Sequence, residues 1–187
     1  MRTIRKSESL RKLTIICLLV AGSLSTFAEE KLVDHRGESF SIAQLQGKVV
    51  LLVIGFTNCE EICPTEMARA TIALGEMEDN IKHVQPIFLT VDPERDSPEV
   101  IAKYLKSFHP SFIGISGDSE TLTELVKHYG VSPKENRHHG ENKQIDHGYS
   151  TFILNTHGKI EVAVLPGLPP SHLSELIFKM TEEKHRG

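Results

Sequence analysis

The sequence lacks the features of a chain built from several parts. It has no low-complexity tract, no internal repeat and no interdomain linker, which excludes a repeat architecture and argues against two domains. Its 187 residues are enough for one domain whose core needs no disulfide support. Hydrophobic residues make up 39% and charged residues 25%, an ordinary composition for a soluble globular protein.

The sequence also lacks an apolar run long enough to cross a membrane. The run over residues 13–24 is roughly a dozen residues long, whereas a spanning helix needs about 20. Basic residues precede it, and the small residues Thr26 and Ala28 follow at the spacing that a signal peptidase requires. This order predicts a secretory signal peptide over residues 1–28 and a single domain over residues 29–187. The alternative is an uncleaved anchor, so the domain is expected in a bacterial periplasm or at the outer face of the cytoplasmic membrane.

Positive charge is scarce once the predicted leader is set aside. The first 28 positions hold five of the 21 Lys and Arg residues and one of the 25 acidic residues. The remainder therefore has 16 basic and 24 acidic side chains, a net charge of −8 with neutral histidine. So acidic a surface argues against nucleic acid as a partner. It attracts cations, although weakly and without specificity.

Cysteine is scarce as well, with three in the chain. Cys17 lies inside the apolar run and is interpreted as hydrophobic filler, which leaves Cys59 and Cys63, four positions apart. In an exported protein a lone close pair is a disulfide, a redox couple or part of a metal site. A disulfide that closes so small a loop restricts the unfolded chain little, so structural stapling is the weakest of the three.

Hydrophobic patterning predicts an α/β domain. Buried strands are expected at 48–56 and 84–91, with a helix between them that begins at Pro64 and ends near Asp79. A capped helix at 97–108, a strand at 112–116 and a second capped helix at 118–130 are expected next. A loop at 132–147, a hairpin at 151–165 and a last helix from Pro170 onward complete the chain. With a short hairpin before residue 48, this order is the thioredoxin arrangement, a mixed central sheet flanked by helices with a helix–strand–helix insertion.

The cysteine pair lies where a buried strand ends and the next helix begins. Open α/β sheets place ligand sites at such strand ends, and a helix N-terminus stabilises thiolates. Side chains four apart on a helix share a face, with Cβ atoms about 5–6 Å apart. That spacing suits a disulfide and equally suits two sulfurs on one soft metal ion. Glu60 and Glu61 either raise the thiol pKa and favour a bound cation or simply form a solvated loop.

A metal site needs further ligands, and His147 is the candidate. It directly precedes the hairpin, and in a thioredoxin fold that junction packs close to the helix start that bears the cysteines. Two thiolates and an imidazole suit Cu(I) and are tolerable for Cu(II) or Zn(II), whereas structural zinc normally has four protein ligands. His138 and His139 either capture metal transiently or are plain loop. The other histidines are expected to be structural or surface residues, at His35, His83, His109, His128, His157, His172 and His185.

Four motifs in the chain resemble those of the Sco/SenC copper proteins. They are, in the same order as in that family, residues 55–66 (GFTNCEEICPTE), 91–98 (VDPERDSP), 108–114 (FHPSFIG) and 146–147 (DH). The resemblance spans about residues 32–165. The combination is specific, whereas a cysteine pair of this spacing alone is weak.

The resemblance implies a thioredoxin fold that binds one copper ion through Cys59, Cys63 and His147. It also implies copper delivery to the dinuclear copper site of cytochrome c oxidase, or maintenance of the thiols of that site, although some relatives serve other periplasmic copper or redox tasks. The expected partners are a copper-receiving protein, such as a cytochrome c oxidase subunit or another periplasmic copper protein, and a thiol reductant. We expect a monomer. Glu60 stands where the family often has proline, and the N-terminus looks cleavable where many members carry a membrane anchor. These departures leave the copper site intact and concern the identity of the client.

Asp92 and Arg95 follow the second predicted strand, at the same sheet end as the cysteines. In one interpretation they orient a ligand or form a partner surface. In the other they form a buried ion pair that fixes the turn.

Three functions compete for this sequence. The first is a copper chaperone or assembly factor, which is not an enzyme. The second is a periplasmic thiol–disulfide oxidoreductase that acts on client cysteines. The third, a peroxide-reducing enzyme, needs a reactive thiol with a basic neighbour, and the surroundings of Cys59 are acidic. His147 separates the first two, because disulfide exchange needs only the thiols.

Overall fold

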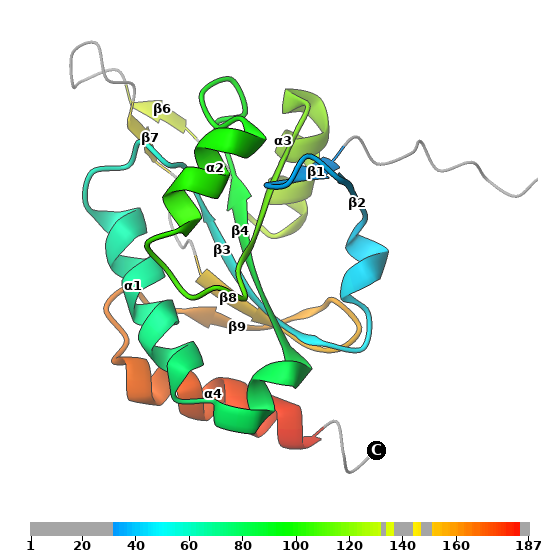
Figure 1. The fold of residues 1–187 in the computed structure, drawn as a ribbon, viewed down its shortest axis with the longest axis vertical. Coiled ribbons are helices and arrows are strands. Elements are labelled where there is room, and N and C mark those ends of the chain that lie inside the picture. Colours follow the sequence, from blue (N-terminus) through cyan, green and yellow to red (C-terminus); the bar gives the residue numbers. More distant parts are fainter. Residues whose placement is uncertain (1–31, 132–133, 137–143, 147–150, 184–187) are drawn as a thin grey trace, which may run out of the picture.

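The computed structural model describes residues 32–131, 134–136, 144–146 and 151–183. In this part of the chain a seven-stranded sheet forms the centre of the molecule (Figure 1), in the order β2-β1-β5-β4-β3-β8-β9. Its strands are Leu32–Asp34 (β1), Ser39–Phe40 (β2), Val49–Gly55 (β3), Val84–Thr90 (β4), Ile113–Gly117 (β5), Thr151–Leu154 (β8) and Ile160–Val164 (β9). The predicted buried strands and the N-terminal hairpin, β1–β2, are confirmed.

The middle of the sheet is parallel and its outer strands are antiparallel. β3 pairs with β4 in parallel along its whole length, from Val49 opposite Val84 to Gly55 opposite Thr90, and β4 pairs with β5 in the same sense. β8 is antiparallel to β3, β9 to β8, and β1 to β5. Because β3 and β4 are parallel and in register, the loops that follow Gly55 and Thr90 leave the sheet side by side.

Helices cover both faces of this sheet (Figure 1). One face carries α1 (Ile62–Gly75), α2 (Pro98–Leu105) and α4 (Pro170–Glu183), and the other carries the 3-10 helix η2 (Ile42–Leu45) and α3 (Ser119–His128). Alternate residues of β3 enter the two cores, as pleating requires. Leu51 lies in the cluster with Met67 and Ile177, and Leu52 lies in the cluster with Leu122. Burial on both faces explains the continuous apolar run of β3.

Capping side chains begin two helices where the sequence predicts them. The Ser97 hydroxyl accepts the N–H of Val100 at 3.4 Å, and an Asp118 carboxylate oxygen accepts the N–H of Thr121 at 3.1 Å. α2 ends at Leu105, earlier than the predicted residue 108. The unit β3–α1–β4, completed by β8–β9 and α4, is the predicted thioredoxin-like fold, and α2–β5–α3 is the predicted insertion.

The helix that follows β3 differs from its prediction at both ends. α1 begins at Ile62, so Pro64 is its third residue rather than its first, and it ends at Gly75 rather than near Asp79. Proline is tolerated there because the first four N–H groups of a helix have no partner within the helix. A separate 3-10 helix, η3 (Glu78–His83), takes up the following residues.

The predicted loop over residues 132–147 is wrong in part. It contains two short strands, β6 (Lys134–Asn136) and β7 (Gln144–Asp146), which pair antiparallel as a small second sheet. Each has three residues, which is too short for the run of alternating apolar and polar side chains that identifies a longer strand.

Several predictions fall on residues outside the described ranges. They concern the leader over residues 1–28, the histidines His138 and His139, and His147. Among the described helices, none is both long and apolar enough to cross a membrane.

Candidate metal and thiol site

The two cysteines lie at the C-terminal edge of the sheet, between β3 and α1. β3 ends at Gly55, a turn follows, and Cys63 is the second residue of α1. The Cys63 side chain is only 1% exposed, whereas Cys59 is half-buried. The structure joins neither of them in a disulfide. One sulfur therefore lies inside the core and the other near the surface.

Cys59 is not part of the helix, which corrects the prediction that both cysteines share a helical face. It precedes α1, whose first residue is Ile62. The N–H of Cys63 donates to the Cys59 Sγ at 3.3 Å, so the Cys59 sulfur accepts one of the N–H groups that the first helical turn leaves free. The prediction that a helix N-terminus supports the thiols holds, but through a sulfur that caps the helix from outside it.

Gly55 makes room for the buried sulfur. A Cβ placed on Gly55 would lie 2.6 Å from the Cys63 Sγ and 3.5 Å from the ring of Phe88. Real Cβ atoms are almost never that close to another atom, so any larger residue would push the sulfur away. Gly55 belongs to the cysteine motif, but no pattern in the sequence indicates this role.

Asp96 anchors the cysteine-bearing loop to the neighbouring strand. Its carboxylate is fully buried and accepts three hydrogen bonds. These come from the Thr57 N–H at 3.0 Å, the Thr57 hydroxyl at 2.5 Å and the Thr90 hydroxyl at 2.6 Å. Since Thr57 follows β3 and Thr90 ends β4, one carboxylate ties the two strand ends together. Asp96 stands inside the VDPERDSP motif, but no pattern in the sequence indicates this anchoring role.

Asp92 and Arg95 form the ion pair of the structural interpretation. The Arg95 guanidinium donates to the buried Asp92 carboxylate. The central carbon of the guanidinium lies 5.9 Å from the centroid of the Phe56 ring. The N–H of Asp92 in turn donates to the Thr90 hydroxyl at 3.0 Å. These contacts fix the turn after β4 against the residue that begins the cysteine loop.

Electrostatics hold the proton on the buried thiol. A hydrogen bond with the Cys59 side chain, then burial, then the nearby charges of Cys59 and Asp96 raise the pKa of the Cys63 thiol far above its ordinary value. A backbone hydrogen bond from Phe56 acts in the opposite direction. The predicted rise in thiol pKa is thus confirmed for Cys63, but Glu60 and Glu61, the predicted cause, are not among the groups that raise it. Glu60 and Glu61 are both exposed, as the solvated-loop interpretation expects.

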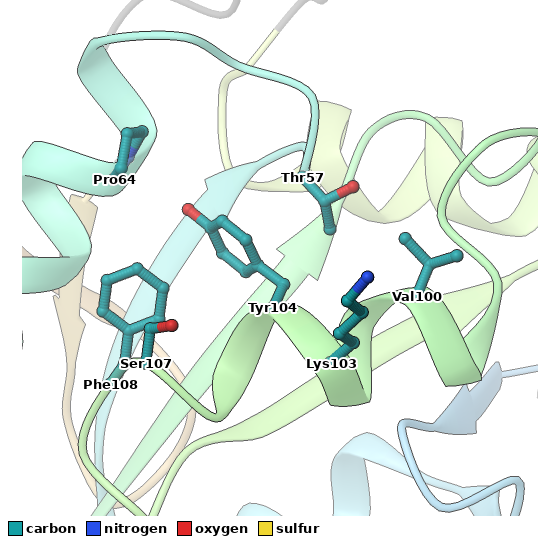
Figure 2. A pocket seen from close by; sticks show the side chains of 7 residues that line it. All are labelled: Thr57, Pro64, Val100, Lys103, Tyr104, Ser107 and Phe108. Carbon is teal, nitrogen blue, oxygen red and sulfur yellow. The ribbon is translucent and has the colours of Figure 1, made fainter.

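A pocket of about 470 Å³ opens beside the pair, between α1 and α2 (Figure 2). Its lining is Thr57, Pro64, Val100, Lys103, Tyr104, Ser107 and Phe108. Three of these side chains are apolar, and the other four carry a hydroxyl or ammonium group. The Tyr104 hydroxyl is buried and makes no hydrogen bond to any part of the chain that the structure describes. Burial first, and then the neighbouring Cys63 and Cys59, raise the pKa of Tyr104 above its ordinary value.

The predicted third ligand, His147, lies outside the described ranges. Within them, no three His, Cys, Asp or Glu side chains are grouped to hold a metal ion. Two of the remaining histidines have the structural roles expected of them. His35 Nδ1 accepts the N–H of Gly114 at 3.1 Å, and His109 Nδ1 lies 2.7 Å from the Ser111 hydroxyl.

Comparison with known proteins gives one consistent result. The family model SCO1/SenC matches residues 25–182. An SCO2-like protein of Rickettsia prowazekii is 34% identical over 131 residues, which is 69% of this chain and 64% of that protein. The chain thus spans less than two thirds of the length of that relative.

Solved structures share the fold. That of ScoI from Bradyrhizobium japonicum with copper bound has a TM-score of 0.74 and 28% identity, over 80% of this chain and 95% of that one. That of BsSco, described as a Sco-family cytochrome c oxidase assembly protein with a disulfide switch, has a TM-score of 0.66 over 81% and 90% of the two chains. At 23% identity the second likeness concerns the fold alone.

Proposed function

Because the chain belongs to the SCO1/SenC family, we propose that it binds one copper ion through the thiolates of Cys59 and Cys63 and the imidazole of His147, and passes that copper to another protein. The receiving protein is proposed to be a cytochrome c oxidase subunit or another periplasmic copper protein. The chain acts as an exported carrier, with copper as its cargo, and needs a thiol reductant to keep its cysteines available.

The cysteine pair carries this proposal. Two cysteine sulfurs meet at one helix start, where the Cys63 N–H donates to the Cys59 sulfur at 3.3 Å. The raised pKa of the buried Cys63 thiol means that a bound cation has to displace a proton there. The two cysteine thiolates form a soft donor set, which selects Cu(I) over harder ions.

The described topology is compatible with a third ligand from the chain just before β8. β8 pairs antiparallel with β3, and its first residue, Thr151, lies opposite Val53. The chain therefore enters β8 at the sheet edge where β3 ends and the cysteine loop begins. A ligand at position 147, four residues before Thr151, is within reach of that edge because an extended chain advances about 3.3 Å per residue.

The second candidate function is thiol–disulfide exchange, which the unequal exposure of the two thiols favours. Half-buried Cys59 is the attacking thiol in this scheme and buried Cys63 the resolving one. The Cys59 thiolate attacks a client disulfide, and one client sulfur leaves. Cys63 then attacks the Cys59 sulfur and releases the second client thiol. The client gains two electrons and two protons, and the pair is left as a disulfide.

Metal analysis with an optical spectrum tests the copper proposal. The reduced protein should bind one copper per chain, and Cu(II) should give an intense sulfur-to-copper charge-transfer band. Cys59→Ala and Cys63→Ala should each abolish tight binding and the band, because one thiolate leaves too few soft ligands. His172→Ala, which removes an exposed histidine on α4, is the matched control and should behave as the unaltered protein. Full copper occupancy in both cysteine variants would show that the assigned site is wrong.

A further inference from the structure

Large apolar side chains are exposed at only five places in the described part of the chain. Three of them, Ile62, Val100 and Leu165, are 56%, 41% and 60% exposed; we call these three side chains the apolar edge. The other two are Ile72, farther along α1, and Phe178 on α4. A single exposed apolar side chain needs no explanation, but a group of them beside a reactive site indicates a surface that another molecule covers.

Two members of the apolar edge adjoin the cysteine loop from α1 and α2. Ile62 begins α1 and directly precedes Cys63. Val100 lines the pocket together with Thr57 and Pro64, which come before and after the cysteines in the chain. Figure 2 shows this pocket between the cysteine-bearing loop and α2, with Val100 on the α2 side. The pocket is therefore continuous with the cysteine site.

Leu165 reaches the same edge of the sheet from β9. It follows Val164, the last residue of β9, which lies opposite Thr151 of β8. Thr151 in turn pairs with β3 two residues before that strand ends, so β9 ends at the sheet edge that carries the cysteines. The loop after Leu165 is held to α1, because the N–H of Gly167 donates to the buried Glu66 carboxylate at 3.2 Å.

A protein client explains why this edge is apolar. Copper transfer and disulfide exchange both require a client atom to reach the half-buried Cys59 sulfur or a metal ion bound to it, so the surface around that sulfur is covered at that moment. Charges of both signs adjoin the apolar edge, from exposed Glu60 and Glu61 on the loop and exposed Lys103 on α2. An apolar centre with a charged rim is the usual composition of an interface between proteins.

We propose that the apolar edge and the adjoining pocket are the docking surface for a client polypeptide that presents apolar side chains beside the atom it brings to Cys59. This inference rests on the proposed function in taking the partner to be a protein, and it applies to copper transfer and to disulfide exchange alike. One client side chain enters the pocket of about 470 Å³, where Pro64, Val100 and Phe108 provide apolar contacts.

Two model peptides test this surface without copper and without a known client. One has a cysteine between two leucines, the other a cysteine between two serines, and in both that cysteine forms a mixed disulfide with 5-thio-2-nitrobenzoate. The Cys59 thiolate of the reduced, metal-free protein bonds to the peptide sulfur, and the coloured aryl thiolate leaves with the electron pair of the broken bond. Cys63 then releases the peptide thiol and closes the Cys59–Cys63 disulfide. The leucine peptide should react about fivefold faster, because its side chains are buried on docking.

Serine substitutions locate the surface. Ile62→Ser, Val100→Ser and Leu165→Ser should each reduce the preference for the leucine peptide, and the ratio of the two rates should approach one in the triple variant. Ile72→Ser and Phe178→Ser are the matched controls, because they remove exposed apolar side chains elsewhere. Ile72 lies ten residues along α1 from Ile62, about 15 Å at the helical rise per residue. Both controls should keep the full preference.

Three results would overturn the inference. They are equal rates for the two peptides with the unaltered protein, an equal loss of preference in the edge and control variants, and a fall in both rates with the preference intact, which would show an altered thiol. A dimer of the unaltered protein, seen by ultracentrifugation and abolished by the three edge substitutions, would assign the surface to a second copy of the chain instead. If the unaltered protein fails to bind copper, the copper function falls, while the ratio of peptide rates still decides the docking surface.

Discussion

Replacing Asp96 with alanine should destabilise the protein severely, because it leaves three donors without an acceptor. The buried carboxylate accepts from the Thr57 N–H, the Thr57 hydroxyl and the Thr90 hydroxyl. Each buried donor left unpaired costs about 1–3 kcal/mol. Thr57 is only half-buried, so water recovers part of this, and we expect a loss of about 3–5 kcal/mol in the free energy of unfolding. That is a large part of the ~5–15 kcal/mol of a typical domain.

Asp96→Asn is the informative comparison, because asparagine keeps one acceptor oxygen. One carboxylate oxygen, Oδ2, takes both the Thr57 N–H and the Thr90 hydroxyl, and the other takes only the Thr57 hydroxyl. An amide oxygen in place of Oδ2 retains two bonds, and the amide nitrogen can donate to the Thr57 hydroxyl, which rotates to accept. The loss should therefore be about 1 kcal/mol, the difference between a charged and a neutral acceptor.

Urea denaturation followed by circular dichroism measures both variants, since the chain has no tryptophan for fluorescence. The alanine variant should also bind copper more weakly, because the loop that bears Cys59 loses its anchor to β4. Alanine within about 1 kcal/mol of the unaltered protein would refute the anchoring role. Asparagine as damaging as alanine would show that the charge, and not the number of accepted bonds, is what matters.

Three more predictions follow from the site and the N-terminus. Gly55→Ala should displace the Cys63 sulfur, costing about 1–3 kcal/mol in unfolding free energy and weakening copper binding. Gly75→Ala, in α1 with nothing within 4 Å of the added carbon, should instead stabilise the protein by roughly 0.5–1 kcal/mol. Urea denaturation of the two glycine variants measures this contrast, and equal changes in unfolding free energy would contradict the close packing at Gly55. Oxidising the cysteine pair should prevent copper uptake until a reductant is added, because a disulfide has no thiolate to donate; uptake by the oxidised protein in a metal assay would exclude the thiolate ligands. N-terminal sequencing of protein from the native host should begin at about Glu29, and recovery of residues 1–28 in the membrane fraction would favour the anchor.

The strands and helices of the core could be predicted because their signals are local. β3 and β4 are continuous apolar runs, and α2 and α3 begin at the capping residues Ser97 and Asp118, which act through neighbouring N–H groups. β6 and β7 could not be predicted in this way, since a three-residue run with at most one apolar side chain forms a strand only through the partner strand that it meets. The start of α1 was misplaced because proline is acceptable at any position of the first turn, not only the first.

The candidate site could be predicted only as far as its sulfur chemistry. Cys59 and Cys63 are evident from their spacing and from the family motif. The residues that support them act across long sequence separations. Asp96 holds Thr57, 39 positions away. Such roles depend on which side chains the fold brings together, and no local pattern encodes them.

The most direct test of the central claim is the copper affinity of His147→Ala, measured by anaerobic competition titration. The account predicts at least a tenfold weaker affinity, corresponding to about 1.4 kcal/mol or more, with the disulfide potential of the cysteine pair nearly unchanged. His157→Ala, which removes an exposed histidine from the β8–β9 turn, should keep full affinity. If His147→Ala binds copper as tightly as His157→Ala, the three-ligand copper site is contradicted, and thiol–disulfide exchange becomes the better account of the cysteine pair.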